Sequence, residues 1–93
     1  MPRFVAIHNL GPGAREIFAQ RGPAMLAALK EVYPEVVWSG VHIEWETGKA
    51  VCVWDAPDLA TVKGLFEQLQ VPYDDLFPAE WMSPHDMAMA GGA

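Results

Sequence analysis

The chain has 93 residues, of which 52% are hydrophobic, and its 12 acidic and 6 basic side chains give a formal charge of −6 at pH 7. This length corresponds to one domain, and the hydrophobic content excludes an intrinsically disordered chain. Because the few basic residues are scattered and outnumbered, we expect neither nucleic acid nor an anionic membrane surface as a partner.

The number of cysteines and the N-terminal sequence indicate the cellular compartment of the protein. Cys52 is the only cysteine, so an internal disulfide is impossible, which suits a reducing compartment. The start of the chain lacks a long apolar segment followed by a small-residue cleavage site, and no apolar run reaches the roughly 20 residues of a membrane span. We therefore expect a cytoplasmic protein.

Two elements are predicted in the first third of the chain. Residues 3–10 form a short apolar run that ends at the Gly-Pro-Gly of residues 11–13, which indicates a strand closed by a turn. Residues 14–33 carry apolar side chains at helical spacing. Pro23 interrupts this pattern, so we expect either a kink or a short first turn followed by a helix from Pro23.

A hairpin, a helix and a final strand are predicted in the remainder. Residues 35–45 and 50–55 are rich in β-branched and aromatic side chains and flank a short polar turn, which is typical of a β-hairpin. Residues 58–70 form a helix pattern with an aspartate as N-cap. A last strand is expected near residues 75–82, and Pro78 places it at a sheet edge.

The order β-α-β-β-α-β predicts a ferredoxin-like α+β sandwich. In that fold the first and third strands are central, and the second and fourth lie at the edges. We expect residues 1–84 to form this domain. The small, Met-containing segment of residues 85–93 is expected to be a disordered tail.

The register of the hairpin decides which side chains share a face of the sheet. A two-residue turn would place Cys52 beside Val41 on one face and His42 on the other. A three-residue turn, with Gly48 in the left-handed region as a bulge, would place His42 and Cys52 on one face. We expect the three-residue turn, because it leaves the other face purely aliphatic for the two helices to cover.

In this register the helix-free face is lined with aromatic and polar side chains. They are Phe4, His8, Trp38, His42, Glu44, Cys52 and Trp54. Full burial of each aromatic is worth a few kcal/mol at about 25 cal/mol per Å². We therefore expect this face to pack on a second copy, giving a homodimer of the dimeric α+β barrel type with a cavity between the sheets.

These side chains form a candidate metal site. His42 and Glu44 would project side by side from one strand. Cys52 would lie opposite His42, and His8 two strands away. Such ligands suit nickel or another divalent transition metal. Alternatively, His42 and Glu44 are a solvated pair, and Cys52 and His8 are ordinary core residues.

The same face also permits an enzyme or a binding module without chemistry. In an enzyme, Trp38, Trp54 and Phe4 would be the walls of a pocket for a small apolar organic molecule, and His8 or His42 would be the general base. Dimeric α+β barrels of this size include small monooxygenases and isomerases. An apolar cavity would favour this interpretation over metal storage, whereas a filled, dry face would favour the binding module.

One motif resembles a known family. Residues 51–57, Val-Cys-Val-Trp-Asp-Ala-Pro, resemble the C-V-(Y/W)-x-A-P signature of small bacterial nickel-binding, ferredoxin-like proteins. The opening M-P-x-(F/Y)-V and the segments at residues 71–72 and 82–84 are similar as well, so the resemblance covers residues 1–84. It implies a dimer that binds nickel through histidine-containing sites. The family's W-x-H-S-Y strand differs here: Gly40 takes the histidine position after Trp38, and His42 follows two residues later on the same face.

Overall fold

The computed structural model describes residues 1–91 as a small sandwich of a sheet and two helices, followed by a third helix. The elements in chain order are β1 (Arg3–Asn9), α1 (Ala14–Glu31), β2 (Val37–Glu44), β3 (Lys49–Asp55), α2 (Leu59–Leu69), β4 (Asp75–Ala79) and α3 (Pro84–Gly91). The predicted β-α-β-β-α-β order is confirmed. Within these residues, no helix combines the length and the apolar character needed to cross a bilayer.

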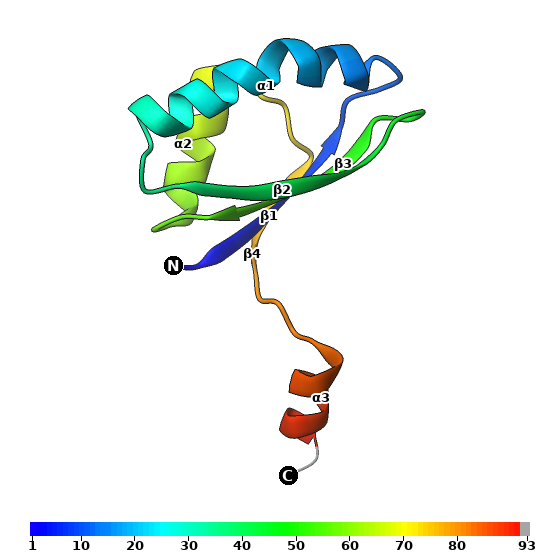
Figure 1. Cartoon of the computed structure of the whole chain (residues 1–93), viewed down its shortest axis with the longest axis vertical. Helices are drawn as coiled ribbons and strands as arrows, with labels where there is room; N and C mark the ends of the chain where they lie inside the picture. The colour runs from blue at the N-terminus through cyan, green and yellow to red at the C-terminus, as the bar shows by residue number, and fades with distance from the viewer. Residues whose placement is uncertain (92–93) are drawn as a thin grey trace.

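The sheet has the topology of a ferredoxin-like fold. Its strand order is β2-β3-β1-β4, and every neighbouring pair is antiparallel. The predicted edge positions of β2 and β4 are therefore confirmed, and Pro78 lies on an edge strand, where its missing N–H is tolerated. α1 and α2 both cover one face of the sheet (Figure 1).

Local sequence signals explain both covering helices. α2 begins after Asp58, whose side chain accepts a hydrogen bond from the backbone N–H of Thr61 at 2.8 Å, as predicted for an N-cap. α1 is one continuous helix with Pro23 inside it, rather than a short turn followed by a separate helix. Near its start, Phe18 and Arg15 pack on the Trp45 ring, which joins α1 to the end of the hairpin.

The register of the hairpin differs from the predicted one. Glu44 pairs with Lys49 across a turn formed by residues 45–48, so the three-residue turn is wrong. The Glu44 carboxylate explains the longer turn, because it accepts the backbone N–H groups of Glu46 and Thr47, each at 2.8 Å. Gly48 does adopt a left-handed φ of 79°, as expected. The side chains of the two strands nevertheless share faces as the two-residue turn would have placed them.

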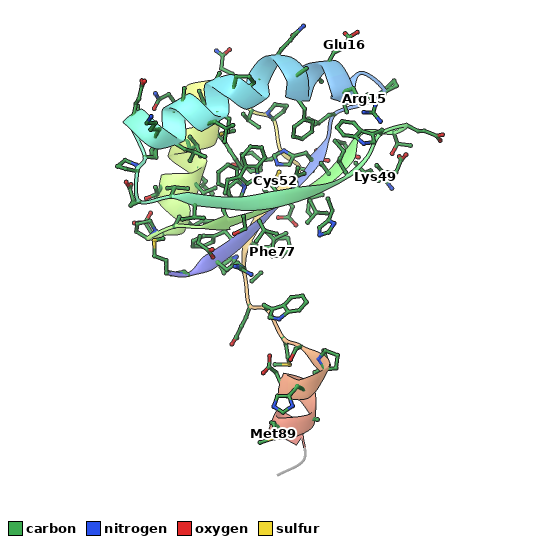
Figure 2. The ribbon with its side chains drawn as sticks, viewed as in Figure 1. Arg15, Glu16, Lys49, Cys52, Phe77 and Met89 are labelled. Carbon is green, nitrogen blue, oxygen red and sulfur yellow. The ribbon has the colours of Figure 1, made fainter. Side chains whose placement is uncertain are left out.

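The helices also cover the face opposite to the predicted one. The face under α1 and α2, here called the covered face, buries six residues of the two central strands: Phe4, Ala6, His8, Ala50, Cys52 and Trp54. The opposite, open face carries aliphatic side chains such as Val51 and Val53. Figure 2 shows Cys52 on the helix side of the sheet and Phe77 on the other side. The expectation of an aliphatic covered face and an aromatic open face is therefore wrong.

A third helix replaces most of the predicted disordered tail. Ser83 and Asp86 form a capping box, in which each backbone N–H donates to the other side chain at 3.0 Å. Pro84 occupies the first turn, a position that suits proline. α3 thus covers residues 85–91 of the segment expected to be a disordered tail, while residues 92 and 93 lie outside the described part. α3 projects away from the sheet (Figure 1).

Candidate functional site

The four predicted metal ligands lie on two opposite faces of the sheet. His8 and Cys52 are buried on the covered face, with 3% and 4% of their surface exposed. His42 and Glu44 are exposed on the open face, because His42 pairs with Val51 rather than Cys52. Among residues 1–91, no group of three or more His, Cys, Asp or Glu side chains could hold a metal ion. The predicted ligand set is therefore not assembled within one chain.

Glu44 has a structural role in the turn. Its carboxylate is hydrogen-bonded to the Thr47 side chain and to the backbone of Thr47 and Glu46. These hydrogen bonds, with the Thr47 side chain contributing most, lower the pKa of Glu44. A carboxylate engaged in this way closes the hairpin.

An apolar cavity lies between α1 and the covered face. Its volume is about 140 Å³. The lining comes from three parts of the chain: the sheet and the residue after β1 (His8, Leu10, Trp38, Cys52, Trp54), α1 (Ile17, Phe18, Arg21, Gly22, Met25), and α2 with the segment after it (Phe66, Val71, Pro72). Two of the three predicted pocket walls, Trp38 and Trp54, are thus in the lining. Phe4 is buried on the same face but outside the lining.

Aromatic packing holds the cavity wall in place. The Trp38 and Trp54 rings stack with centroids 5.4 Å apart and an interplanar angle of 9°. Trp54 also meets Phe66 edge-to-face at 5.4 Å, and Phe66 meets His8 in the same way at 5.6 Å. Such offset and edge-on contacts are the favoured geometries of aromatic pairs. The wall is therefore preformed by the core.

Three buried ring nitrogens of this wall have no hydrogen-bond partner among the described residues. They are Nε2 of His8 and Nε1 of Trp38 and of Trp54. About nine in ten buried polar groups in folded proteins are paired, so these three are exceptions. Their residues line the cavity, but the nitrogen atoms themselves are enclosed by protein atoms. The other His8 nitrogen, Nδ1, lies 2.7 Å from the Pro72 carbonyl oxygen.

The Cys52 thiol is unreactive in this environment. Burial raises the pKa of its thiol to about 11, although the nearby Trp38 indole acts in the opposite direction without reaching hydrogen-bond geometry. The thiol is therefore protonated at neutral pH. Because the thiolate is the form that attacks substrates and binds metals, Cys52 contributes an apolar wall to the cavity.

α1 supplies the part of the site that the sequence analysis missed. The apolar spacing predicted the buried side of this helix, but nothing identified it as one side of a cavity. Gly22 was an available signal, because a glycine inside a helix costs about 1 kcal/mol relative to alanine and therefore suggests a packing or functional reason for its presence. Here it lies in the cavity lining.

The fold defines the chain as a ferredoxin-like α+β protein. It is similar to the crystal structure of SCO4226 from Streptomyces coelicolor A3(2), with a TM-score of 0.72. The alignment has 17% sequence identity and covers 87% of this chain and 99% of that chain. At this identity the likeness shows the fold alone. No protein-family model and no curated protein matches the chain.

Proposed function

We propose that this protein binds a small, largely apolar organic molecule in the cavity between α1 and the sheet. The observation that carries the proposal is an apolar cavity whose lining includes the polar residues His8 and Arg21. An apolar pocket with a few convergent polar groups is the usual form of a small-molecule site. The apolar walls supply the affinity for such a molecule.

The cavity size supports a ligand built on a single ring. An engineered protein cavity of about 150 Å³ with apolar walls takes up benzene. The cavity of this protein, at about 140 Å³, is of similar volume. Because the Trp54 and Phe66 walls are fixed in the core, binding a ring here requires little ordering of the protein.

The same arrangement indicates which histidine would act if the ligand is also a substrate. His8 is in the cavity lining, whereas His42 is exposed on the opposite face of the sheet. Of the two general bases considered from the sequence, His8 alone belongs to a residue set that lines the cavity. The proposal concerns binding alone, because an enzyme and a binding protein would both have to bind the molecule.

Filling the cavity tests this proposal. Gly22 lines it, and open space surrounds the position of a Cβ there, with no described atom within 4 Å. We expect Gly22→Leu to abolish toluene binding, measured by calorimetry or tryptophan fluorescence, while the helix gains up to about 1 kcal/mol from the lost glycine. Ala24→Leu, on the exposed side of α1, is the matched control. Undiminished toluene binding in Gly22→Leu would place the site elsewhere.

The homodimer is a second proposal, supported by the open face. Val51 and Phe77 are 36% and 38% exposed there, beside the partly buried Val53. A contiguous apolar patch on a small protein commonly marks an interface, and two sheets pack face to face about 10 Å apart. The Arg3–Asp55 ion pair lies at one end of these strands and supplies a polar rim.

A charge in the middle of this patch is expected to disrupt the dimer. Val53 lies on the central strand β3, so Val53→Lys would bury a lysine between two sheets, where an unpaired charge is unfavourable. Sedimentation velocity should show a dimer for the wild type and a monomer for Val53→Lys. Val32→Lys, an exposed valine after α1, should remain dimeric. A monomeric wild type, or a dimer that tolerates Val53→Lys, would contradict the proposal.

Two predictions from the sequence remain proposals without added support. Nickel or another divalent metal is favoured by the resemblance at residues 51–57, but only His8 and Cys52 of the predicted ligands line one cavity. A cytoplasmic location is favoured by Cys52, which is a free thiol.

A further inference from the structure

Arg21 is the one charged residue in the lining of the cavity, counted over the described part of the chain. It shares one side of α1 with the four other lining residues of that helix, which are Ile17, Phe18, Gly22 and Met25. The side of a helix that faces a protein core is ordinarily apolar. Arg21 is exposed, whereas Met25 is buried, so Arg21 lies where the lining meets solvent.

A hydrogen bond holds the Arg21 guanidinium at this edge. Its Nη1 atom donates to the backbone carbonyl of Gln70 at 2.6 Å. Gln70 ends α2 in the left-handed conformation, with a φ of 53°, and the next residue, Val71, lines the cavity. The guanidinium therefore bridges α1 and the segment after α2, which are two of the three parts of the chain that surround the cavity.

Most of the donors of this guanidinium remain available. Arginine has five N–H donors in a planar fork, and the bond to Gln70 engages Nη1 only. The one ion pair within residues 1–91 joins Arg3 to Asp55, so no carboxylate of the described chain neutralises Arg21. The edge formed by Nε and Nη2 has the geometry that binds the two oxygens of a carboxylate.

We propose that the ligand is an amphipathic carboxylate, with a ring in the apolar cavity and a carboxylate on Arg21 at its edge. This inference rests on the proposed function, because it names the class of molecule that the same cavity binds. The chain as a whole carries a charge of −6 and does not attract anions in general. A preference for a carboxylate must therefore come from a local cation, and Arg21 is the cation in the lining.

The test compares carboxylates with neutral amides of the same size on the full chain. Phenylacetate is paired with phenylacetamide, 3-phenylpropionate with 3-phenylpropionamide, and toluene is the uncharged reference. In at least one pair we expect the carboxylate to bind about fivefold more tightly than its amide, the upper range for an exposed ion pair. This preference should fall in 1 M NaCl, which screens exposed charges, while toluene binding does not weaken.

Two matched variants assign the preference to one side chain. Arg21→Gln removes the charge and keeps a polar N–H, so carboxylate and amide should bind equally while toluene affinity is retained. Arg15→Gln removes the same charge from the same helix, but Arg15 lies over the Trp45 ring, outside the lining (Figure 2). The preference for the carboxylate should persist in Arg15→Gln.

The possible outcomes separate this inference from the proposed function. Toluene binding without a preference for either carboxylate would overturn the inference and leave the proposed function standing. A carboxylate preference that survives in Arg21→Gln, or that is lost equally in Arg15→Gln, would also overturn it. Binding of none of the five probes would overturn both.

Discussion

Trp54→Ala is expected to lower the free energy of unfolding by about 3–5 kcal/mol, the range for removing a large aromatic side chain from a core. Trp54 is 1% exposed and lies between the Trp38 ring and the Phe66 ring, so its loss removes the ring stacked on Trp38 and one of the aromatic contacts of Phe66. A domain of this size has a total stability of about 5–15 kcal/mol, so the variant should be partly unfolded at mild denaturant concentrations. Urea unfolding followed by circular dichroism measures the change.

Trp81→Ala is the matched control for this variant. The same atoms are removed, but Trp81 is 74% exposed on the segment between β4 and α3. Its substitution should leave the unfolding midpoint of the monomeric fold within about 0.5 kcal/mol of the wild type, as for ordinary surface positions. A small loss in Trp54→Ala, similar to that of Trp81→Ala, would show that the covered face is not the core.

Gly48→Ala should be the second most damaging substitution, with an expected loss of about 2 kcal/mol or more. Its φ of 79° lies in the left-handed region, which costs an L-residue about 1–2 kcal/mol. A Cβ at this position would also collide with the backbone of Gly11, so the turn and the β1–α1 loop would have to separate. Their separation would break the 2.9 Å hydrogen bond from the Leu10 N–H to the Gly48 carbonyl.

Gly64→Ala provides the control for this glycine. A Cβ there would make only an ordinary contact with the Tyr33 hydroxyl at 3.7 Å, and the helical position favours alanine by up to about 1 kcal/mol. The two glycine variants should therefore shift thermal unfolding in opposite directions. A Gly48→Ala protein as stable as the wild type would contradict the observed turn, and with it the register of β2 against β3.

The elements could be predicted because their signals are local. The Asp58 N-cap, the alternation within the strands and the proline on the last strand each act within a few residues. The hairpin register could not be predicted in this way, because it depends on the positions that a carboxylate and a loop take in the folded chain. Glu44 closes the turn with its side chain, and Gly48 is held against Gly11, which is far from it in sequence.

The candidate site was predicted only in part, because its geometry also depends on contacts between distant segments of the chain. His8, Cys52 and Trp54 were expected to share a face, and they do, although it is the covered face. A bulge between Trp38 and Gly40 then places His42 on the opposite side from Trp38, which strict alternation along the strand would not allow. The wall supplied by α1 depends on tertiary packing, and no spacing rule in the sequence reports it.

Intermolecular NOE spectroscopy with bound toluene is the most direct measurement of where a ligand ring lies. A ring in the cavity predicts NOEs from toluene to the Met25 methyl group and to the Trp54 and Phe18 rings, which line it on two sides. The open face is the competing apolar surface of this protein. NOEs confined to Val51, Val53 and Phe77 on that face would contradict the proposed site.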